Sequence, residues 1–333
     1  MKKLSLLFSL LLVFSLGCGE KTRVEVPDTA RQDAKLMPAE TNALMYCDFS
    51  QIAKSPQADR ILAQIEQRLQ NEVEHEEYQN FKEATGFDPR KDFHSMLAGA
   101  LEGKDEDRNW YAVIHGRFDE QRLTSYLKEQ VEKKGREIPW QEEIVAGHRV
   151  YASNKRPHFG LCFLNESTIY LGNREWIAEV LETKTSGEIP KIFTSAENTV
   201  RYGDQFWVKA EVAALHEKQE PFSHDLHRAF PKFDAVEDVV FSAHVSEGMQ
   251  FEGQILCDNA QDSKLLVDML KGALAAAKLQ VSNDRTAVDA LNGVKINHQG
   301  NKALVQGELT EKFFETLRTR KLFIWREHGH EVI

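Results

Sequence analysis

Two stretches of the chain, ALMYCDFSQI at residues 43–52 and FWVKAEVAAL at residues 206–215, decide the expected fold. Each begins with apolar residues at alternate positions, which is typical of a β-strand with one buried face. Such strands occur mainly in antiparallel sheets, because parallel strands are buried on both faces. The expected buried faces consist of Met45, Cys47 and Phe49 in the first stretch, and Phe206, Val208, Ala210 and Val212 in the second.

The two stretches begin the two halves of an internal repeat. Glu211 follows Asp48 by 163 residues, and two further pairs of motifs recur in the same order at a spacing of 146 residues. These pairs are GFDPRKDF (86–93) with KFDAVEDV (232–239), and VAGHRVY (145–151) with LNGVKIN (291–297). Three matches in one order indicate a duplication.

Each half is predicted to contain the same series of elements: a strand, a helix, a β-hairpin, a second helix, short strands and a closing helix. The hairpin strands are expected at 94–101 and 110–117 in the first half, and at 239–245 and 250–257 in the second. We therefore expect an α+β fold of two tandem repeats, each a mostly antiparallel sheet with helices packed on one face. The repeats span residues 41–190 and 195–320, and a C-terminal tail spans 321–333.

Residues 1–17 have the features of a secretory signal peptide. Lys2 and Lys3 form a short basic region, and Leu4 to Leu16 is an apolar run interrupted only by serines. This run is shorter than the about 20 residues that a membrane-spanning helix needs. An ordinary signal peptide or an uncleaved anchor are the alternatives to the lipoprotein signal described next.

Ser15-Leu16-Gly17-Cys18 resembles the lipobox of bacterial lipoproteins, although serine stands where that pattern usually has leucine. The resemblance implies cleavage before Cys18 and acylation of its thiol by fatty acids such as palmitate. Gly19, in place of an aspartate, implies export to an outer membrane, with the body facing the periplasm or the cell surface. Residues 18–40 are expected to form the lipidated N-terminus and a flexible tether, because they are charged and show no helical or strand period.

The composition limits the kinds of partner. The formal net charge is −10, whereas nucleic-acid-binding proteins need basic clusters, so no nucleic acid is expected. The expected partners are the membrane, through the lipid anchor, and an envelope protein. No cofactor is implied.

The body resembles a family of bacterial exported proteins of unknown function that have a duplicated α+β architecture. The resemblance depends on Lys54-Ser55-Pro56, on the GxDPxxD element at 86–92 and on the GRFD turn at 116–119. The second half lacks the proline and the GRFD turn. The resemblance implies the fold but neither a substrate nor an active site.

Paired acids recur in both halves, as Asp88 with Asp92 and Asp234 with Asp238. Paired carboxylates can act as general acid and base. Asp88 precedes Pro89, however, which is the arrangement of a helix N-cap, and Asp234 is spaced like the start of a capping box. We therefore expect structural turn motifs and no catalytic residues.

Histidines gather with acids at His216, His224 and His227, which makes them weak metal-site candidates. No further ligand lies at a diagnostic spacing, and a solvated helix face explains them as well, so no metal site is predicted. Three cysteines follow Cys18: Cys47, Cys162 and Cys257. We expect buried thiols, with a bridge between Cys47 and Cys162 as the alternative.

Motifs of nucleophile elbows, phosphate-binding loops, dinucleotide folds and zinc proteases are absent from the sequence. The sequence therefore favours a membrane-anchored lipoprotein with a binding or structural role in the cell envelope. An envelope hydrolase with an unrecognised active site is the alternative.

The Cys18→Ser variant tests the anchor. We expect it to leave the membrane fraction, because without acyl chains only about twenty polar residues precede the body. Membrane partitioning and mass spectrometry of both proteins provide the measurement. A membrane-bound variant, together with a wild type that carries no acyl mass, contradicts the lipoprotein signal.

Overall fold

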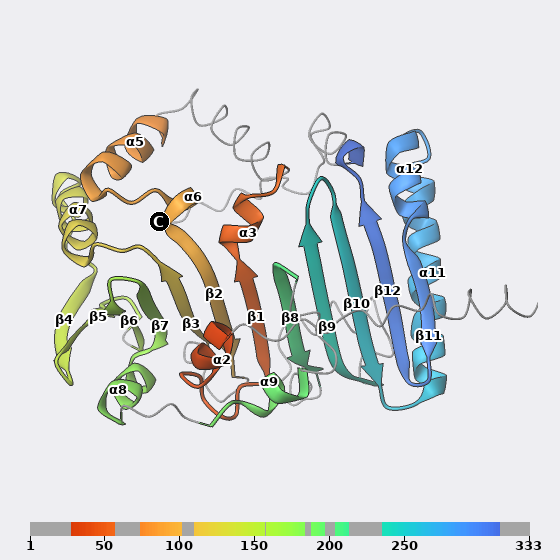
Figure 1. Ribbon diagram of the computed structural model, residues 1–333, viewed down its shortest axis with the longest axis horizontal. Coiled ribbons are helices and arrows are strands. Elements are labelled where there is room, and N and C mark those ends of the chain that lie inside the picture. The colour runs from red at the N-terminus through yellow and green to blue at the C-terminus, as the bar shows by residue number, and fades with distance from the viewer. Residues whose placement is uncertain are drawn as a thin grey trace, which may run out of the picture.

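The computed structural model describes residues 28–56, 74–101, 110–156, 158–183, 188–196, 204–212 and 235–313. Their strands form one antiparallel sheet of 12 strands, in the order β11-β12-β10-β9-β8-β1-β2-β3-β7-β6-β5-β4 (Figure 1). The first half contributes β1 (Ala43–Asp48), β2 (Phe93–Ala100), β3 (Trp110–Gly116), β4 (Trp140–Val145), β5 (His148–Ser153), β6 (Phe159–Asn165) and β7 (Thr168–Asn173). The second half contributes β8 (Phe206–Glu211), β9 (Val236–Val245), β10 (Met249–Cys257), β11 (Lys295–Gln299) and β12 (Lys302–Leu309).

The helices follow strand ends or connect strands. They are α2 (Asp28–Ala34), α3 (Phe49–Ala53), α5 (Glu74–Thr85), α6 (Pro89–Asp92), α7 (Glu120–Lys133), α8 (Arg174–Thr183), α9 (Lys191–Ala196), α11 (Ala260–Gln280) and α12 (Arg285–Asn292). The side chains of Asp48, Asp88, Asp119, Asn259 and Asp284 cap α3, α6, α7, α11 and α12 by accepting backbone N–H groups of the first turn.

The centre of the sheet is the pairing of β1 with β8. Five residue pairs are in antiparallel register, from Ala43 opposite Ala210 to Cys47 opposite Phe206. Tyr46 lies opposite Trp207, and their rings stack at 5.7 Å between centroids. The two stretches that predicted the fold therefore lie side by side and join the two halves.

The expected α+β class and the antiparallel sheet are confirmed, but two separate sheets are not found. The strands of both halves form one sheet. If the halves formed separate sheets, β1 and β8 would be edge strands with unpaired backbone N–H and C=O groups. These groups bond to one another when β1 pairs with β8, so both edges are removed.

Helices cover both faces of the first half, which corrects the prediction that they pack on one face. One face lies under α2, α8 and α9, whose buried residues join Val113, Val150 and Tyr170 in one core. The other face lies under α5 and α7, where Phe81 and Leu123 pack with Phe163, Ile169 and other apolar residues. Strands β3, β6 and β7 have consecutive apolar residues, as strands buried on both faces do.

In the second half, α11 packs along one face of the strands. Leu266, Val267, Leu270 and Leu274 contact a core that includes Ile255, Ile296 and Ala303. Successive strand residues point to opposite faces, and the strand register places this core on the same face as the core under α5 and α7.

The most buried side chains of β8 are on the face opposite to the predicted one. Trp207 and Lys209 are fully buried, whereas Phe206 and Val208 are half-buried. Trp207 packs in the core under α2 and α9, and the Lys209 ammonium lies 3.0 Å from the Asp238 carboxylate. The alternation correctly identified a strand, but it could not identify a lysine buried by an ion pair.

The tether expected at residues 18–40 extends less far along the chain. Residues 28–34 form α2, in which Ala30 and Ala34 are buried, and Met37 is buried after it. The Leu36 carbonyl accepts hydrogen bonds from Tyr170 Oη at 2.7 Å and Trp176 Nε1 at 3.0 Å. This segment belongs to the folded body (Figure 1), and Cys18 lies outside the described residues.

The three described cysteines are free and buried. Cys47 shares a sheet face with Phe163, so the adjacent Cys162 points to the opposite face, and β2, β3 and β7 lie between their strands. A bridge between them is therefore incompatible with the fold. Burial raises the pKa of Cys47 to about 11, that of Cys162 to about 12 and that of Cys257 to about 11, so all three remain thiols.

Replacement of Trp207 tests the joined sheet. We expect Trp207→Ala to lower the free energy of unfolding by about 3–5 kcal/mol, because it leaves a cavity between the halves. In urea, β3 and β10 should both lose protection against hydrogen exchange in a single transition. Trp110→Ala, whose side chain is 40% exposed, is the control and should cost clearly less. Separate transitions, with β3 unaffected, would contradict a shared core.

Candidate functional site

A hollow of about 770 Å³ opens at the start of α7, between the end of β3 and the loop after α5. We call it the arginine hollow, because three arginines line it. Its lining includes Gly86, Phe87, Arg117, Phe118, Glu120, Arg122, Arg149 and Glu166.

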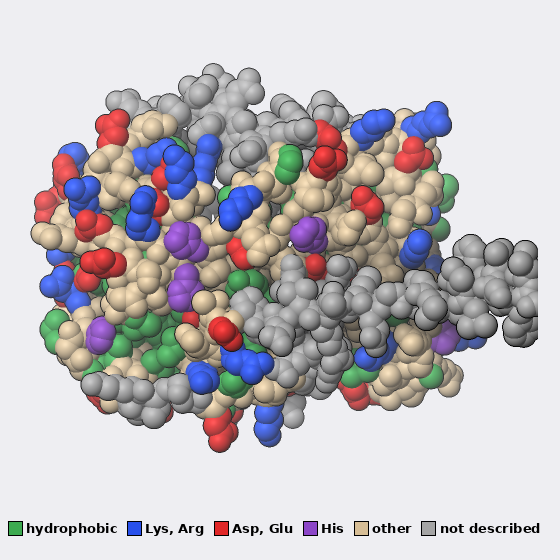
Figure 2. All heavy atoms as spheres, in the orientation of Figure 1, with side chains coloured by type: hydrophobic (Ala, Val, Ile, Leu, Met, Phe, Trp, Pro, Cys, Tyr) green, Lys and Arg blue, Asp and Glu red, His purple; other side chains and the backbone are tan. Residues whose placement is uncertain are grey.

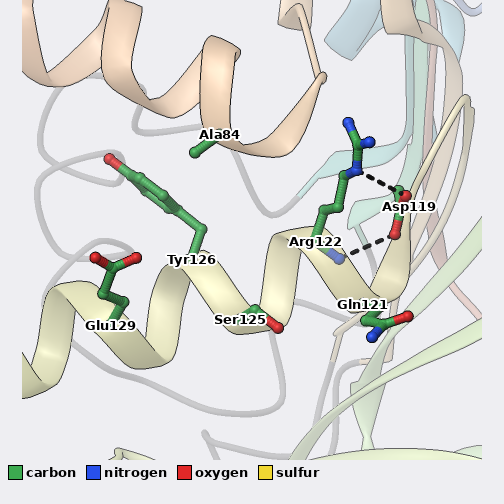
Figure 3. A pocket seen from close by; sticks show the side chains of 7 residues that line it. All are labelled: Ala84, Asp119, Gln121, Arg122, Ser125, Tyr126 and Glu129. Atoms are coloured by element: carbon green, nitrogen blue, oxygen red, sulfur yellow. Dashed lines mark hydrogen bonds and ion pairs between the residues drawn. The ribbon is translucent and has the colours of Figure 1, made fainter.

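Two neighbouring hollows share lining residues with the arginine hollow. One, of about 400 Å³, lies between α5 and α7 and includes Asp119, Arg122 and Tyr126 (Figure 3). The other, of about 500 Å³, is lined by Arg117, Glu166 and Ser167, among others. The three hollows form one depression along the first half of the chain.

Backbone turns position the lining of the arginine hollow. Gly86 has φ +69°, and a Cβ atom there would lie 3.2 Å from Arg122 Nη1. A Cβ on Gly116 would lie 2.3 Å from the Asp92 carbonyl oxygen, so the GRFD turn requires glycine at this position. Phe87 and Phe118 stack at 5.6 Å between ring centroids and, being buried, form a rigid floor.

Each arginine of the hollow pairs with an acid while remaining accessible. Arg117 Nη2 lies 2.6 Å from Asp92 Oδ1, and Arg122 Nε lies 3.5 Å from Asp119 Oδ2. Arg149 lies 3.5 Å from Glu120 and 3.6 Å from Glu142. The hydrogen bond to Tyr151, followed by the charges of these acids, raises the pKa of Arg149. A guanidinium has five N–H donors, so such pairing leaves donors for a ligand.

Figure 2 shows Lys and Arg side chains gathered around α6 and the adjoining end of β2, with acidic side chains interspersed. The charged lining of the arginine hollow is mixed as well, because Asp119, Glu120 and Glu166 line it together with the three arginines. A mixed lining of exposed ion pairs suits recognition of a polar partner that presents several charged groups.

Asp92 and Asp238, the second acids of the two repeated pairs, occupy different positions, because Asp92 ends α6 whereas Asp238 lies within a strand. Asp88 is the N-cap of α6, and its backbone N–H donates to Asp92 Oδ2 at 2.6 Å. Desolvation raises the pKa of Asp88, but the hydrogen bonds from Lys82 and the Arg90 backbone, together with the charges of Lys82 and Lys91, hold that pKa below its usual range. Asp238 lies within β9, where it pairs with Lys209. Asp234 lies outside the described residues, as do His216, His224 and His227.

A second polar cluster lies on the face covered by α2. His115 Nε2 is 2.8 Å and 2.9 Å from the two carboxylate oxygens of Asp33, and His115 Nδ1 is 3.4 Å from Thr168 Oγ1. Asp33 and Thr168 are buried. No sequence pattern indicated this cluster, because Asp33 lies within the expected tether and precedes His115 by 82 residues.

The geometry of this cluster favours structure over catalysis. Ser167 Oγ lies 3.5 Å from Thr168 Oγ1 and donates to Asn165 Oδ1 at 2.7 Å. The hydroxyl that reaches His115 is the buried Thr168, and the hollows described above do not include it. Within the described ranges, no group of three or more His, Cys, Asp or Glu side chains is arranged to hold a metal ion.

Comparison with protein-family models, curated proteins and solved structures finds no significant match. In the part of the chain that the structure describes, none of the helices combines the length and apolar character needed to cross a bilayer.

The Asp33–His115 pair predicts a pH dependence of stability. The hydrogen bond to Asp33 raises the pKa of His115 above 6.5, and burial raises the pKa of Asp33 above 3.8 against the opposing effect of His115. Both raised values mean that the folded protein binds protons more tightly than the unfolded chain. The stabilisation from His115 is therefore complete below pH 6.5 and is lost as the pH rises through its folded pKa.

We expect His115→Asn to lower the free energy of unfolding by about 2 kcal/mol at pH 6 and by less at pH 9. Urea unfolding at both pH values measures the difference. His298→Asn, at an exposed position of β11, is the control. An equal loss at the two pH values would show that the charge of His115 does not stabilise α2.

Proposed function

We propose that the chain is a lipid-anchored bacterial lipoprotein of the cell envelope that binds a partner protein without catalysis. The signal-like residues 1–17 and Cys18 support the anchor. The arginine hollow supports binding, because it presents accessible guanidinium groups beside a rigid aromatic floor.

The observation on which this proposal depends is the exposure of the charged groups in the hollow. The side chains of Arg117, Arg122 and Arg149 are 75%, 61% and 48% exposed. Catalytic sites usually hold titratable groups in enclosed, desolvated surroundings that perturb their pKa values. Open ion pairs instead can exchange their internal partners for those of another protein.

The three arginines indicate which chemical groups the partner presents to the hollow. Guanidinium groups bind carboxylates in a bidentate manner, so we propose an acidic segment of an envelope protein as the occupant. Glu120 and Glu166 at the same hollow would contact basic residues that flank this segment.

We further propose that the body consists of two tandem repeats. Strands β1, β2 and β3 are neighbours in the sheet in their chain order, and so are strands β8, β9 and β10. In each half a helix follows the last of these three strands, α7 after β3 and α11 after β10. The first half has the additional hairpin β4-β5 at its outer edge. VAGHRVY ends in β5, which is three strands from β3 in the sheet. LNGVKIN ends in β11, which is only two strands from β10. The two matched motifs therefore do not occupy equivalent places in the sheet.

Charge reversal at the hollow tests the proposed function. We expect Arg122→Glu with Arg149→Glu to reduce crosslinked capture of the partner from native membranes by about tenfold or more. Both arginines are exposed, so the variant should fold. Lys295→Glu, at an exposed position of β11, changes charge outside the hollow and should leave capture unchanged.

Unchanged capture by the double variant would contradict the proposed site. The alternative, an envelope hydrolase, makes a different prediction: a fluorophosphonate probe would label a serine such as Ser167 in the wild type. If the wild type is labelled and Ser167→Ala is not, the result supports a hydrolase and contradicts a purely binding function.

A further inference from the structure

Residues 28–41 pack on the sheet ahead of β1 (Figure 1), and we call this segment the strap. The backbone hydrogen bonds that residues 35–41 donate to other backbone groups are local, such as that from Leu36 N–H to the Asp33 carbonyl at 2.9 Å. The ladder between β1 and β2 begins after the strap, at Ala43. A segment outside the ladder depends on its side-chain contacts to stay in place.

The apolar contacts of the strap are small. The buried residues of α2 are Ala30, Asp33 and Ala34, and Met37 is buried after the helix. Met37 fits closely against Gly99 of β2, where a Cβ atom would lie 3.2 Å from Met37 Sδ. Two alanines bury little apolar area, and a seven-residue helix is not stable alone, so the contacts of the buried aspartate contribute a large share of the docking.

Asp33 connects the strap to β3 through an ion pair with His115. His115 Nε2 lies 2.8 Å and 2.9 Å from the two carboxylate oxygens, and the Asp33 side chain is only 6% exposed. An ion pair that is largely removed from water is sensitive to the protonation of either partner. The pair therefore links the docking of the strap to pH.

The groups that face this pair from the neighbouring strands are neutral. Burial and, to a smaller extent, the charges of Asp48 and Asp33 raise the pKa of Tyr46 on β1 to about 12. On β2 and β7, the side chains across from His115 are the hydroxyls of Ser95 and Thr168, which do not titrate. The strap itself carries four charged residues that are not buried: Asp28, Arg31, Lys35 and Glu40.

Both members of the pair favour docking in acid. The hydrogen bond to Asp33 raises the pKa of His115 above 6.5, and burial raises the pKa of Asp33 above 3.8. The docked strap therefore binds protons more tightly than the released strap does. The contribution of His115 to docking is complete below pH 6.5 and is lost as the pH rises through its pKa in the docked state.

The strap also sets the length of chain between Cys18 and the body. While the strap is docked, ten residues connect Cys18 to Asp28, and after its release 24 residues connect Cys18 to Asn42. A chain spans at most about 3.6 Å per residue, so the two limits are about 36 Å and about 86 Å. Release of the strap therefore more than doubles the possible reach.

We propose that the strap detaches from the sheet as the pH rises above neutral, and that its release lengthens the link between a lipidated Cys18 and the body. The second part rests on the proposed lipid anchor, whereas the first concerns the body alone. In acid, the docked strap keeps Asp28 within about 36 Å of the anchor. At alkaline pH, the released strap lets the arginine hollow reach partners farther from the membrane.

Hydrogen exchange of the full chain with Cys18→Ser, which prevents acylation, tests the release. Labelling at pH 6 and pH 9, corrected for intrinsic exchange rates, follows the amides of Leu36, Met37 and Thr41, which are hydrogen-bonded in the docked strap. We expect their protection to fall by about fivefold from pH 6 to pH 9, because a hydrogen bond between charged groups is stronger than one with a neutral imidazole. The amides of β1 should keep their protection.

His115→Asn should abolish this change with pH and leave the strap weakly protected at both values. His298→Asn, at an exposed position of β11, is the matched control and should keep the change. Equal strap protection at the two pH values in the parent protein, or an unaltered change in His115→Asn, would overturn the proposal. Loss of protection in β1 together with the strap would also overturn it, because the whole sheet would then be opening.

Energy transfer tests the longer link with acylated protein on vesicles of phosphatidylethanolamine and phosphatidylglycerol. A donor dye at position 295 of a Lys295→Cys variant, exposed on β11, reports the distance to acceptor dyes on the headgroups, and the three described native thiols are buried. Transfer should fall from pH 6 to pH 9, and with His115→Asn added it should be low at both values. Constant transfer while the strap opens would overturn the longer link. A chain that stays off the vesicles but shows the pH-dependent exchange would support the strap and contradict the proposed anchor.

Discussion

The backbone pairing of β1 with β8 is the interaction on which the rest of the structure depends. It joins segments 163 residues apart in the sequence, and it removes the only inner edges that the two halves would expose if they folded separately. Around it, Tyr46 and Trp207 stack, and α2 and α9 contribute to the same core. This core includes residues of both halves, whereas the core under α5 and α7 and the core beside α11 each belong to one half.

The hollow at the start of α7 is a consequence of how the first half is built. Its strands are buried on both faces, so α5 and α7 must cover one face while α2, α8 and α9 cover the other. Where α7 begins, the glycine-dependent turns at Gly86 and Gly116 bring two chain segments close together, and the large charged side chains of the lining remain at the surface. The hollow therefore combines a buried aromatic floor with exposed charged groups.

The sequence predicted local elements well and long-range arrangement poorly, for physical reasons. The hairpin strands and the cap at Asp88 follow from periodicity and side-chain chemistry within a few residues. The union of two sheets depends on edges that no local pattern reveals. Two buried charged residues are paired with residues far along the chain: Lys209 with Asp238, and Asp33 with His115. No local pattern predicts the burial of either residue. The arginine hollow combines four separate segments. Sequence motifs at 86–92, 116–119 and 145–151 marked three of them but did not indicate that they meet.

The position of α2 has a consequence for the order in which the protein can fold. Ala30 and Ala34 belong to the same core as Trp207 and Val240, so the surroundings of the first helix of the body are complete only when residues about two hundred positions later have folded. Closing so long a loop is entropically slow, and a chain dominated by such distant contacts folds late rather than during synthesis. The final packing of α2 is therefore expected to be among the last steps of folding, after the strands of the second half have paired with β1.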